Sequence, residues 1–522
     1  AHAAAMAQPA GTEDLARRFG ALEAVSAMRL SPDGTHVAYV TPTSTGQAVV
    51  VVDLIAGGAP KAILSSERKN GAIRRCSWPT DDRLICTMLL STKATGQALF
   101  ATRLITLRSD GSDVKLLSKE ANSRSLGVSM YGGSVIDWTG SKPGWVLMER
   151  NYIPETDIGT RSASDLEGLG VEEVNLDTLQ RRVYEPPRRD GIGFMTDGNG
   201  NIRVSGRMQF SGSGYLRGVT DYVYRTKGSK DWKSLSQVDE RGGGLAVGFR
   251  PVAVDPVLDA VYGFEGGANG RQVLTRLSLD GSNARQTVLS NPEVDVDDLI
   301  TIGRAGRVVG ASYATDRRMV EFFDPDLRKL GAALAKALPG QPQISFVDAS
   351  VDEGKLLLLA GSDVDAGMFY LFDKKAQKLE QLLPLRPDLA GLKLAEMKAV
   401  SYPAADGTMV PAYLTLPVGS AGKDLPAIVM PHGGPSARDE WGFDWLVQFF
   451  AARGYAAVSM RDIAEAVRMV GRGMTVFREM EEPPANRLSE REREVLDLIG
   501  SDPVRARFRL DDDDLDRLTG WV

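Results

Sequence analysis

Short runs of hydrophobic residues, separated by Gly, Asp, Ser and Asn, fill the chain from about residue 25 to residue 390. Such runs, bounded by turn residues, are typical of β-strands. We expect no long amphipathic helix in this stretch, which a short helix at 14–19 precedes. The runs group into similar units: an apolar strand, an Asp/Gly turn, a second strand that ends in small residues, and a third strand that ends in a polar turn.

The units number about seven, and each is about fifty residues long. One strand-like run of each unit lies at 36–40, 99–107, 145–147, 193–204, 260–262, 308–313 and 356–359. Such a series predicts an all-β propeller of about seven blades, in which four-stranded sheets surround a central channel. Because the period varies, six or eight blades remain possible, and two stacked sandwiches are the weaker alternative.

A different pattern follows residue 391. Strands at 397–402 and 410–416 flank the turn residues 405–408, which predicts a hairpin. The apolar run 427–430 predicts a strand of a parallel sheet that is covered on both faces. Apolar residues then recur at helical spacing over 445–453 before Gly454, and 455–460 is apolar again, so the pattern predicts a βαβ crossover.

A glycine loop joins the strand at 427–430 to the helix. Two prolines and two glycines, Pro431, Gly433, Gly434 and Pro435, exclude regular structure there. Glycines also let backbone N–H groups point where a larger residue would obstruct them. Because open α/β sheets bind ligands at the carboxyl ends of their strands, we expect a ligand site at this loop.

The sequence His432-Gly433-Gly434-Pro435, followed by Arg438-Asp439-Glu440-Trp441-Gly442, resembles the start of the catalytic domain of the prolyl oligopeptidase family of serine peptidases. The acylaminoacyl-peptidase and dipeptidyl-peptidase-like branch is the nearest. The resemblance implies an N-terminal propeller, an α/β-hydrolase domain and short peptides as substrates. It also implies that the loop His432, Gly433, Gly434 and Pro435 binds the oxyanion of the tetrahedral intermediate, with the Gly434 N–H as hydrogen-bond donor. Such a donor lowers the activation barrier of the reaction by about 3 kcal/mol.

The resemblance is diffuse over the propeller, specific from about Val400, and ends at Met460. Beyond that point the family has a G-x-S-x-G-G turn, an aspartate and a histidine, whereas residues 461–522 predict charged helices. The three histidines are His2, His36 and His432, and none follows the expected nucleophile position. We therefore expect none of the catalytic triad to be present, as in a truncated or replaced catalytic domain.

Two serines imitate a nucleophile motif. Ser312 stands in Gly-Ala-Ser-Tyr-Ala, and Ser129 stands in a weaker match, Gly-Val-Ser-Met-Tyr. A nucleophile elbow requires a turn from strand to helix, whereas the residues after Ser312 continue as a β-run. We expect Ser312 to lie on a blade strand.

Charge and composition exclude several other functions. A net charge of −6 with 25% charged residues gives no basic surface for nucleic acid. Residues 488–496 resemble the first helix of a LuxR-type helix-turn-helix, but no recognition helix follows. The acidic run 511–514 lacks the spacing of a calcium loop, and two cysteines with scattered histidines do not form a zinc site. We expect no cofactor, no metal and no membrane span, and the oligomeric state cannot be read from the sequence.

The first residues resemble the remnant of an export signal. Ala5-Met6-Ala7 before Gln8 has the small-x-small form of a signal-peptidase site, which predicts a periplasmic or secreted protein. A disordered leader on a cytoplasmic protein is the alternative. Export would permit a disulfide between Cys76 and Cys86, which flank a hairpin turn. A three-residue turn would place the two cysteines directly opposite each other, whereas a two-residue turn would offset them by one residue and put them on opposite faces. We favour two free, buried thiols.

Together these patterns predict a leader and lead-in helix at 1–24, a propeller at 25–390, the N-terminal part of an α/β-hydrolase domain at 391–460 and an atypical helical tail at 461–522. The predicted function is that of a serine peptidase that hydrolyses short peptides, inactive in this chain because the triad is missing. The alternative is an exported propeller that binds peptides or a protein partner without catalysis.

Overall fold

The structure is a computed structural model that describes residues 12–94, 97–156, 163–241, 246–403, 409–432 and 438–460. The chain divides into two compact units. The first, here called the propeller unit, comprises Glu23–Ser362 and Gly367–Arg386. The second, here called the α/β unit, comprises Ala1–Leu22, Asp363–Ala366 and Pro387–Val522. Each unit is described by itself.

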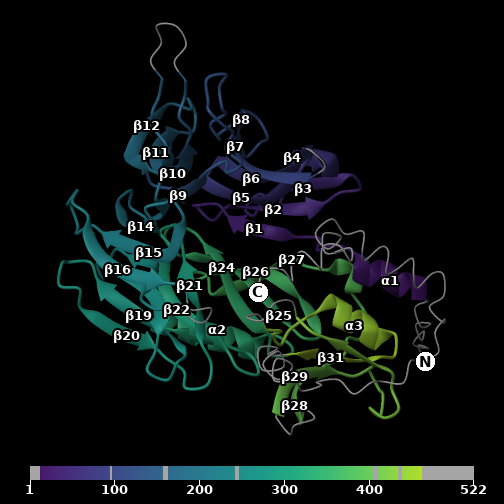
Figure 1. Cartoon of the computed structure of the whole chain (residues 1–522). Helices are drawn as coiled ribbons and strands as arrows, with labels where there is room; N and C mark the ends of the chain where they lie inside the picture. Colours follow the sequence, from purple (N-terminus) through teal and green to yellow (C-terminus); the bar gives the residue numbers. More distant parts are fainter. Residues whose placement is uncertain are drawn as a thin grey trace. The chain divides into compact units, whose positions relative to one another are not determined.

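The described part of the propeller unit contains seven antiparallel sheets, numbered here in chain order (Figure 1). The first three have four strands each. Sheet 1 holds β1 (Ser26–Leu30), β2 (His36–Pro42), β3 (Gly46–Asp53) and β4 (Lys61–Glu67); sheet 2 holds β5 (Ala72–Thr80), β6 (Arg83–Ala94), β7 (Gln97–Arg108) and β8 (Lys115–Leu116); sheet 3 holds β9 (Ser134–Asp137), β10 (Trp145–Tyr152), β11 (Gly168–Asn175) and β12 (Arg181–Arg188).

The other four sheets follow the same order along the chain. Sheet 4 holds β13 (Gly191–Thr196), β14 (Ile202–Phe210), β15 (Leu216–Tyr224) and β16 (Lys233–Asp239); sheet 5 holds β17 (Arg250–Asp255), β18 (Ala260–Gly266), β19 (Gln272–Ser278) and β20 (Arg285–Leu289); sheet 6 holds β21 (Val296–Ile302), β22 (Arg307–Ala314) and β23 (Arg318–Phe322); sheet 7 holds β24 (Gln343–Ala349), β25 (Lys355–Ser362), β26 (Asp365–Asp373) and β27 (Lys378–Pro384).

Hydrophobic clusters join each sheet to the next and close the ring. One cluster combines Ile85 and Leu104 of sheet 2 with Val146 of sheet 3, and equivalent clusters join the other successive pairs. The last cluster packs Tyr39 of sheet 1 against Leu357 of sheet 7. Seven sheets around a closed ring confirm the predicted propeller of about seven blades over the six-bladed, eight-bladed and stacked-sandwich alternatives.

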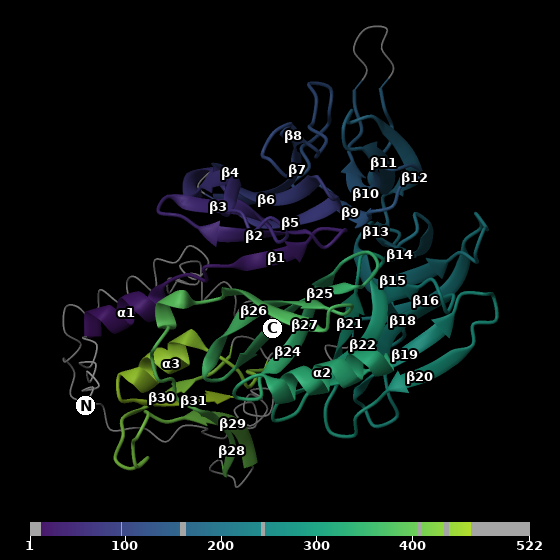
Figure 2. The same cartoon turned by 180° about the vertical axis from the view of Figure 1, so that it is seen from behind.

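Helix α2 (Pro325–Ala337) corrects the expectation that this part of the chain has no long amphipathic helix. It follows β23 where the other sheets have a fourth strand (Figure 2). The Asp324 carboxylate caps it by accepting hydrogen bonds from the amides of Asp326 and Leu327, at 2.9 and 3.1 Å. Leu327 and Leu334 are buried and pack against sheets 6 and 7. The helix therefore completes the core of this blade.

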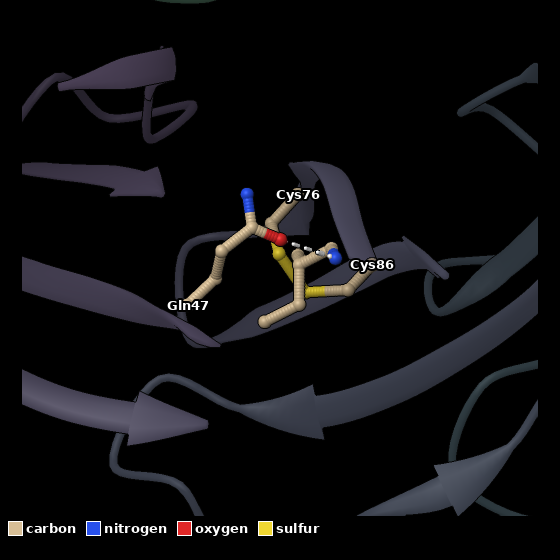
Figure 3. Close-up of a disulfide and its surroundings, with 4 residues drawn as sticks. Gln47, Cys76 and Cys86 are labelled. Carbon is tan, nitrogen blue, oxygen red and sulfur yellow. Dashed lines mark hydrogen bonds between the residues drawn. A yellow bond between two sulfur atoms is a disulfide. The ribbon is translucent and has the colours of Figure 1, made fainter. Parts of the chain in front are cut away.

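Cys76 and Cys86 form a disulfide, so the expectation of two free thiols is wrong (Figure 3). They lie directly opposite each other on β5 and β6. The turn between the strands has only two residues, since Thr80 pairs with Arg83, but a bulge between Ser77 and Thr80 adds one residue to β5. The bulge corrects the one-residue offset of the turn. Beside the disulfide, the Gln47 side chain accepts a hydrogen bond from an amide of β5 at 2.9 Å.

The α/β unit contains α1 (Thr12–Gly20), α3 (Trp445–Ala452) and a mixed four-stranded sheet of order β28-β29-β31-β30. Its strands are β28 (Met397–Pro403), β29 (Met409–Thr415), β30 (Ala427–Met430) and β31 (Ala456–Met460). α1 confirms the lead-in helix, and Phe19 packs edge-on against Phe449 of α3. The paired strands β28 and β29 confirm the predicted hairpin, although its turn at 404–408 lies outside the described residues.

Strand β30 corrects a second expectation, that of a strand covered on both faces. It lies at one edge of the described sheet, and Val429 is 45% exposed. In contrast, β31 pairs with β29 on one side and with β30 on the other, and four of its five residues are buried. Among the described residues, no helix is both long and apolar enough to cross a membrane.

Candidate functional site

The predicted oxyanion loop begins where β30 ends. Of its four residues, the structure describes His432, while Gly433, Gly434 and Pro435 lie outside the described residues. β30 runs parallel to β31, with Ala427 opposite Ala456. The loop and α3 connect these two strands, as in the expected βαβ crossover, so the loop leaves the carboxyl end of a parallel strand. The roles assigned to the loop residues stay predictions.

Local hydrogen bonds explain where α3 begins and ends. The Asp444 carboxylate accepts from the amides of Leu446 and Val447 at 2.8 and 3.0 Å, which satisfies two donors of the first turn. Gly454 follows the last turn with φ of +91°, a conformation that favours glycine. Gly454 was the signal read from the sequence, and the helix ends where it predicts, whereas the Asp444 cap was not among the signals used.

The helix is anchored by one buried polar side chain. Gln448, which is 1% exposed, accepts from the Ala395 amide at 2.8 Å and donates to the carbonyls of Ala395 and Asp363 at 2.7 and 2.9 Å. Trp441 is also buried and donates its indole N–H to the Met397 carbonyl at 3.0 Å. Buried polar groups that are fully hydrogen-bonded fix one arrangement of the surrounding backbone. Trp441 therefore ties the segment after the loop to β28, and Gln448 ties α3 to the residues before β28.

Asp439 is a titratable residue that follows the loop and has a shifted pKa. Its amide donates to the Met460 carbonyl at 3.2 Å, which ties it to the end of β31. Burial raises the pKa of the Asp439 carboxyl, the charge of Asp444 raises it further, and His432 opposes the shift. A carboxyl with a raised pKa beside a predicted oxyanion loop is a feature of functional sites, although ion-pair networks produce it too.

The structure does not bring the serines that imitate a nucleophile into a catalytic arrangement. Ser312 lies within β22, is 1% exposed, and accepts a hydrogen bond from the Arg318 guanidinium at 2.9 Å, as expected for a blade strand. Ser129 donates to the Tyr131 carbonyl at 2.6 Å. Both hydroxyls therefore have structural partners.

The histidines have equally local surroundings where the structure describes them. His36 lies on β2, with its Nδ1 atom 2.7 Å from the Thr35 hydroxyl and its Nε2 atom 3.7 Å from Asp53 Oδ2. His2 lies outside the described residues. In the described part of the chain, no group of three His, Cys, Asp or Glu side chains could hold a metal ion.

A cavity of about 420 Å³ lies on the inner side of the propeller ring. Its lining comes from sheets 1, 2, 3, 6 and 7, largely from the first strand of each or the turn that follows. Three arginines line it: Arg29 on β1, Arg75 on β5, and Arg304 in the turn between β21 and β22. Asp348 on β24 is the one acidic side chain in the lining.

The electrostatics of this cavity are dominated by the arginines. Burial lowers the pKa of Arg304, and the charges of Asp81, Asp348 and Asp137 oppose that shift. Burial raises the pKa of Asp348, while the amide of Leu30, which donates to it at 3.0 Å, acts against the shift. Three positive side chains and one negative one leave the lining with an excess of two positive charges.

The sequence analysis did not identify these arginines. A lone arginine on a β-run carries no motif, and the three are spread over 276 residues of sequence between Arg29 and Arg304. The signal that could have found them is positional. Once the repeats are aligned, Arg29 and Arg75 both fall on the first strand of a blade, which is the strand that faces the channel of a propeller.

Comparison with known proteins supports the resemblance. No family model matches the chain. Dipeptidyl aminopeptidase BIII of Pseudoxanthomonas mexicana is 29% identical over 202 residues, which are 37% of the chain and 29% of that protein. Dipeptidyl peptidase family member 6 of Caenorhabditis elegans is 28% identical over 341 residues, 60% of the chain and 45% of that protein. The chain thus spans less than half the length of these two relatives.

A solved structure from a study of two prolyl endopeptidases has a similar fold. The match has a TM-score of 0.54 at 15% identity and covers 86% of this chain and 63% of that one. At this identity the likeness concerns the fold alone. The chain is thus similar in sequence to two dipeptidyl peptidases and similar in fold to a prolyl endopeptidase, as the resemblance to the prolyl oligopeptidase family implies.

Proposed function

We propose that this chain carries the propeller and the first part of the catalytic domain of an exported serine peptidase that acts on short peptides. The observation that carries the proposal is the parallel pair β30 and β31, joined through the predicted loop and α3. This is the arrangement that an oxyanion loop at the carboxyl end of a sheet requires. In the proposal, His432 shapes the loop and the Gly434 N–H stabilises the oxyanion.

Hydrolysis also requires a nucleophile, a base that takes its proton, and an acid that orients the base. His36 has a place in the first blade, and His432 belongs to the loop itself. The proposal therefore includes no peptidase turnover by the 522-residue chain alone. Export is supported by the disulfide between Cys76 and Cys86, since disulfides persist in oxidising compartments.

The test is to assay the purified chain with fluorogenic dipeptidyl and acylaminoacyl substrates and to label it with a fluorophosphonate probe. We expect neither turnover nor labelling. Turnover that a single change such as Ser312→Ala abolishes would overturn the proposal, because Ser312 would then be the nucleophile. Ser129→Ala is the matched control, since Ser129 lies outside any strand and also has a structural partner.

The second candidate function is peptide or protein binding by the exported propeller without catalysis. It is favoured by the cavity with three arginines, because this cavity is built entirely from propeller residues. Peptide mapping of the protein from its native source separates the two functions. Peptides that continue after Met460 into a G-x-S-x-G-G segment would support the peptidase, and peptides that match 461–522 would support the binding module.

A further inference from the structure

The arginines of the propeller cavity differ from other arginines of the same unit in what they contact. Several buried or half-buried arginines elsewhere are paired with carboxylates, such as Arg203 with Asp259 at 2.6 Å and Arg225 with Glu185 at 2.8 Å. Such pairing is the rule, because taking an unpaired charge out of water is costly. The half-buried Arg29 and Arg304, which form no ion pair with a described carboxylate, therefore require an explanation.

None of the cavity arginines forms an ion pair with a described carboxylate, although the charges of Arg29 and Arg304 act on Asp348 in the lining. Arg29 donates to the carbonyl of its neighbour Met28 at 3.0 Å, and Arg304 donates to the Pro79 carbonyl. For Arg75, which is exposed, no hydrogen bond or ion pair to a described residue is formed. Guanidinium groups have five donors in a planar fork that fits carboxylate and phosphate oxygens. Most of these donors remain available to a ligand here.

The rest of the lining indicates an organic ligand. Trp78 and Trp138 contribute aromatic surface, and the guanidinium of Arg304 lies 6.0 Å from the centre of the Trp138 ring. A volume of about 420 Å³ falls in the range of pockets that enclose small organic molecules. A free inorganic ion would leave the apolar part of such a pocket unfilled.

We infer that this cavity is a binding site for a short acidic peptide, whose carboxylates are held by Arg29, Arg75 and Arg304. A dipeptide of two glutamates has a net charge of −2, which balances the excess of two positive charges in the lining. The inference uses the proposed function only for the choice of a peptide as ligand. Binding needs no nucleophile and no part of the catalytic domain.

The experiment is calorimetric titration of the full chain with the dipeptide Glu-Glu, with Gln-Gln acetylated at its N-terminus and amidated at its C-terminus, and with inorganic phosphate. We expect Glu-Glu to bind, to weaken as salt is added, and to be recovered intact. The neutral dipeptide should not bind. Arg75→Gln should weaken Glu-Glu binding at least about tenfold, because a charge-assisted bidentate contact is lost.

Arg74→Gln is the matched control, since Arg74 is the preceding exposed residue of β5 and does not line the cavity. It should leave the affinity unchanged. Equal binding of both dipeptides, or equal effects of the two variants, would overturn the inference. Phosphate binding that depends on Arg75, without Glu-Glu binding, would overturn the peptide assignment. Hydrolysis of Glu-Glu would contradict the proposed lack of turnover without affecting the binding site.

Discussion

The two units differ in how completely their strands are covered. In the propeller unit, each sheet packs on both neighbours, and the cluster between sheets 1 and 7 closes the ring. In the α/β unit, β30 forms an edge of the described sheet, and Val429 on it is 45% exposed. Stability follows buried apolar contact, so a closed ring protects its strands better than a small sheet whose described part ends in an edge strand. We therefore expect the propeller amides to exchange more slowly.

The largest effect on this comparison is expected from Tyr413→Ala. Tyr413 is 1% exposed in the core of the α/β unit, against Met397, Trp441 and Val447. Loss of a large buried aromatic side chain costs about 3–5 kcal/mol. Hydrogen exchange followed by mass spectrometry should show faster exchange throughout the α/β unit and unchanged protection in the propeller.

Val429→Ala is the control for this variant, because an exposed position should change stability by less than about 0.5 kcal/mol. A contrary result in the unaltered chain would be that the amides of the α/β unit exchange as slowly as those of the propeller, or more slowly. That result would show that the edge position of β30 in the described sheet does not lower stability. A parallel loss of propeller protection in Tyr413→Ala would show that the two units unfold together.

Removing the disulfide should lower the stability of the propeller unit and so reduce the difference in stability between the two units. Cys76 and Cys86 are ten residues apart, and both lie in the buried cluster between sheets 1 and 2. In the chain-entropy model, removing a bridge of this span lowers stability by about 2–3 kcal/mol. The double variant Cys76→Ala/Cys86→Ala should therefore unfold at lower urea concentration in its propeller transition alone.

The unaltered protein treated with a reductant supplies a second form of the same test. Both should shift the propeller transition by a similar amount, since each removes the same cross-link. If the reductant shifts the propeller transition but the double variant does not, a process other than loss of the disulfide changes the stability.

How far the sequence predicted this structure depends on which strand is considered. The inner strands were recognisable, because runs such as β22 are buried along nearly their whole length. The fourth strands were not, and β12 and β20 show why: all of their residues are exposed or half-buried, so no buried apolar run marks them. Hydrophobic patterns report burial, and an outer strand that faces water gives a weak signal.

Two further misses have local physical causes. Helix α2 was overlooked although Asp324 and Pro325 form a standard helix start, because a series of strands raised the expectation of another strand. The disulfide was judged from the length of a turn, whereas the bulge between Ser77 and Thr80 set the register. The loop His432 to Pro435 was predicted from its motif, while the cavity arginines converge only after folding.

The smallest expected effect concerns Asp439, next to the predicted loop. Burial raises the pKa of its carboxyl above the ordinary value of 3.8. The native chain therefore binds this proton more tightly than the unfolded chain, and the α/β unit loses stability as the pH rises from 3.8 through the raised pKa. Asp439→Asn removes the loss and should stabilise the α/β unit at neutral pH by less than about 1 kcal/mol.

The gain should vanish in acid, where Asp439 is protonated in both states, and this pH dependence separates it from a general effect of the substitution. Urea denaturation of the α/β unit at neutral and acidic pH measures both values. Glu440→Gln is the control, because it removes the neighbouring, exposed carboxylate. If Asp439→Asn instead destabilises the unit at neutral pH, the charged form of Asp439 has a favourable partner, and a link between this carboxylate and the loop at His432 becomes the better account of its position.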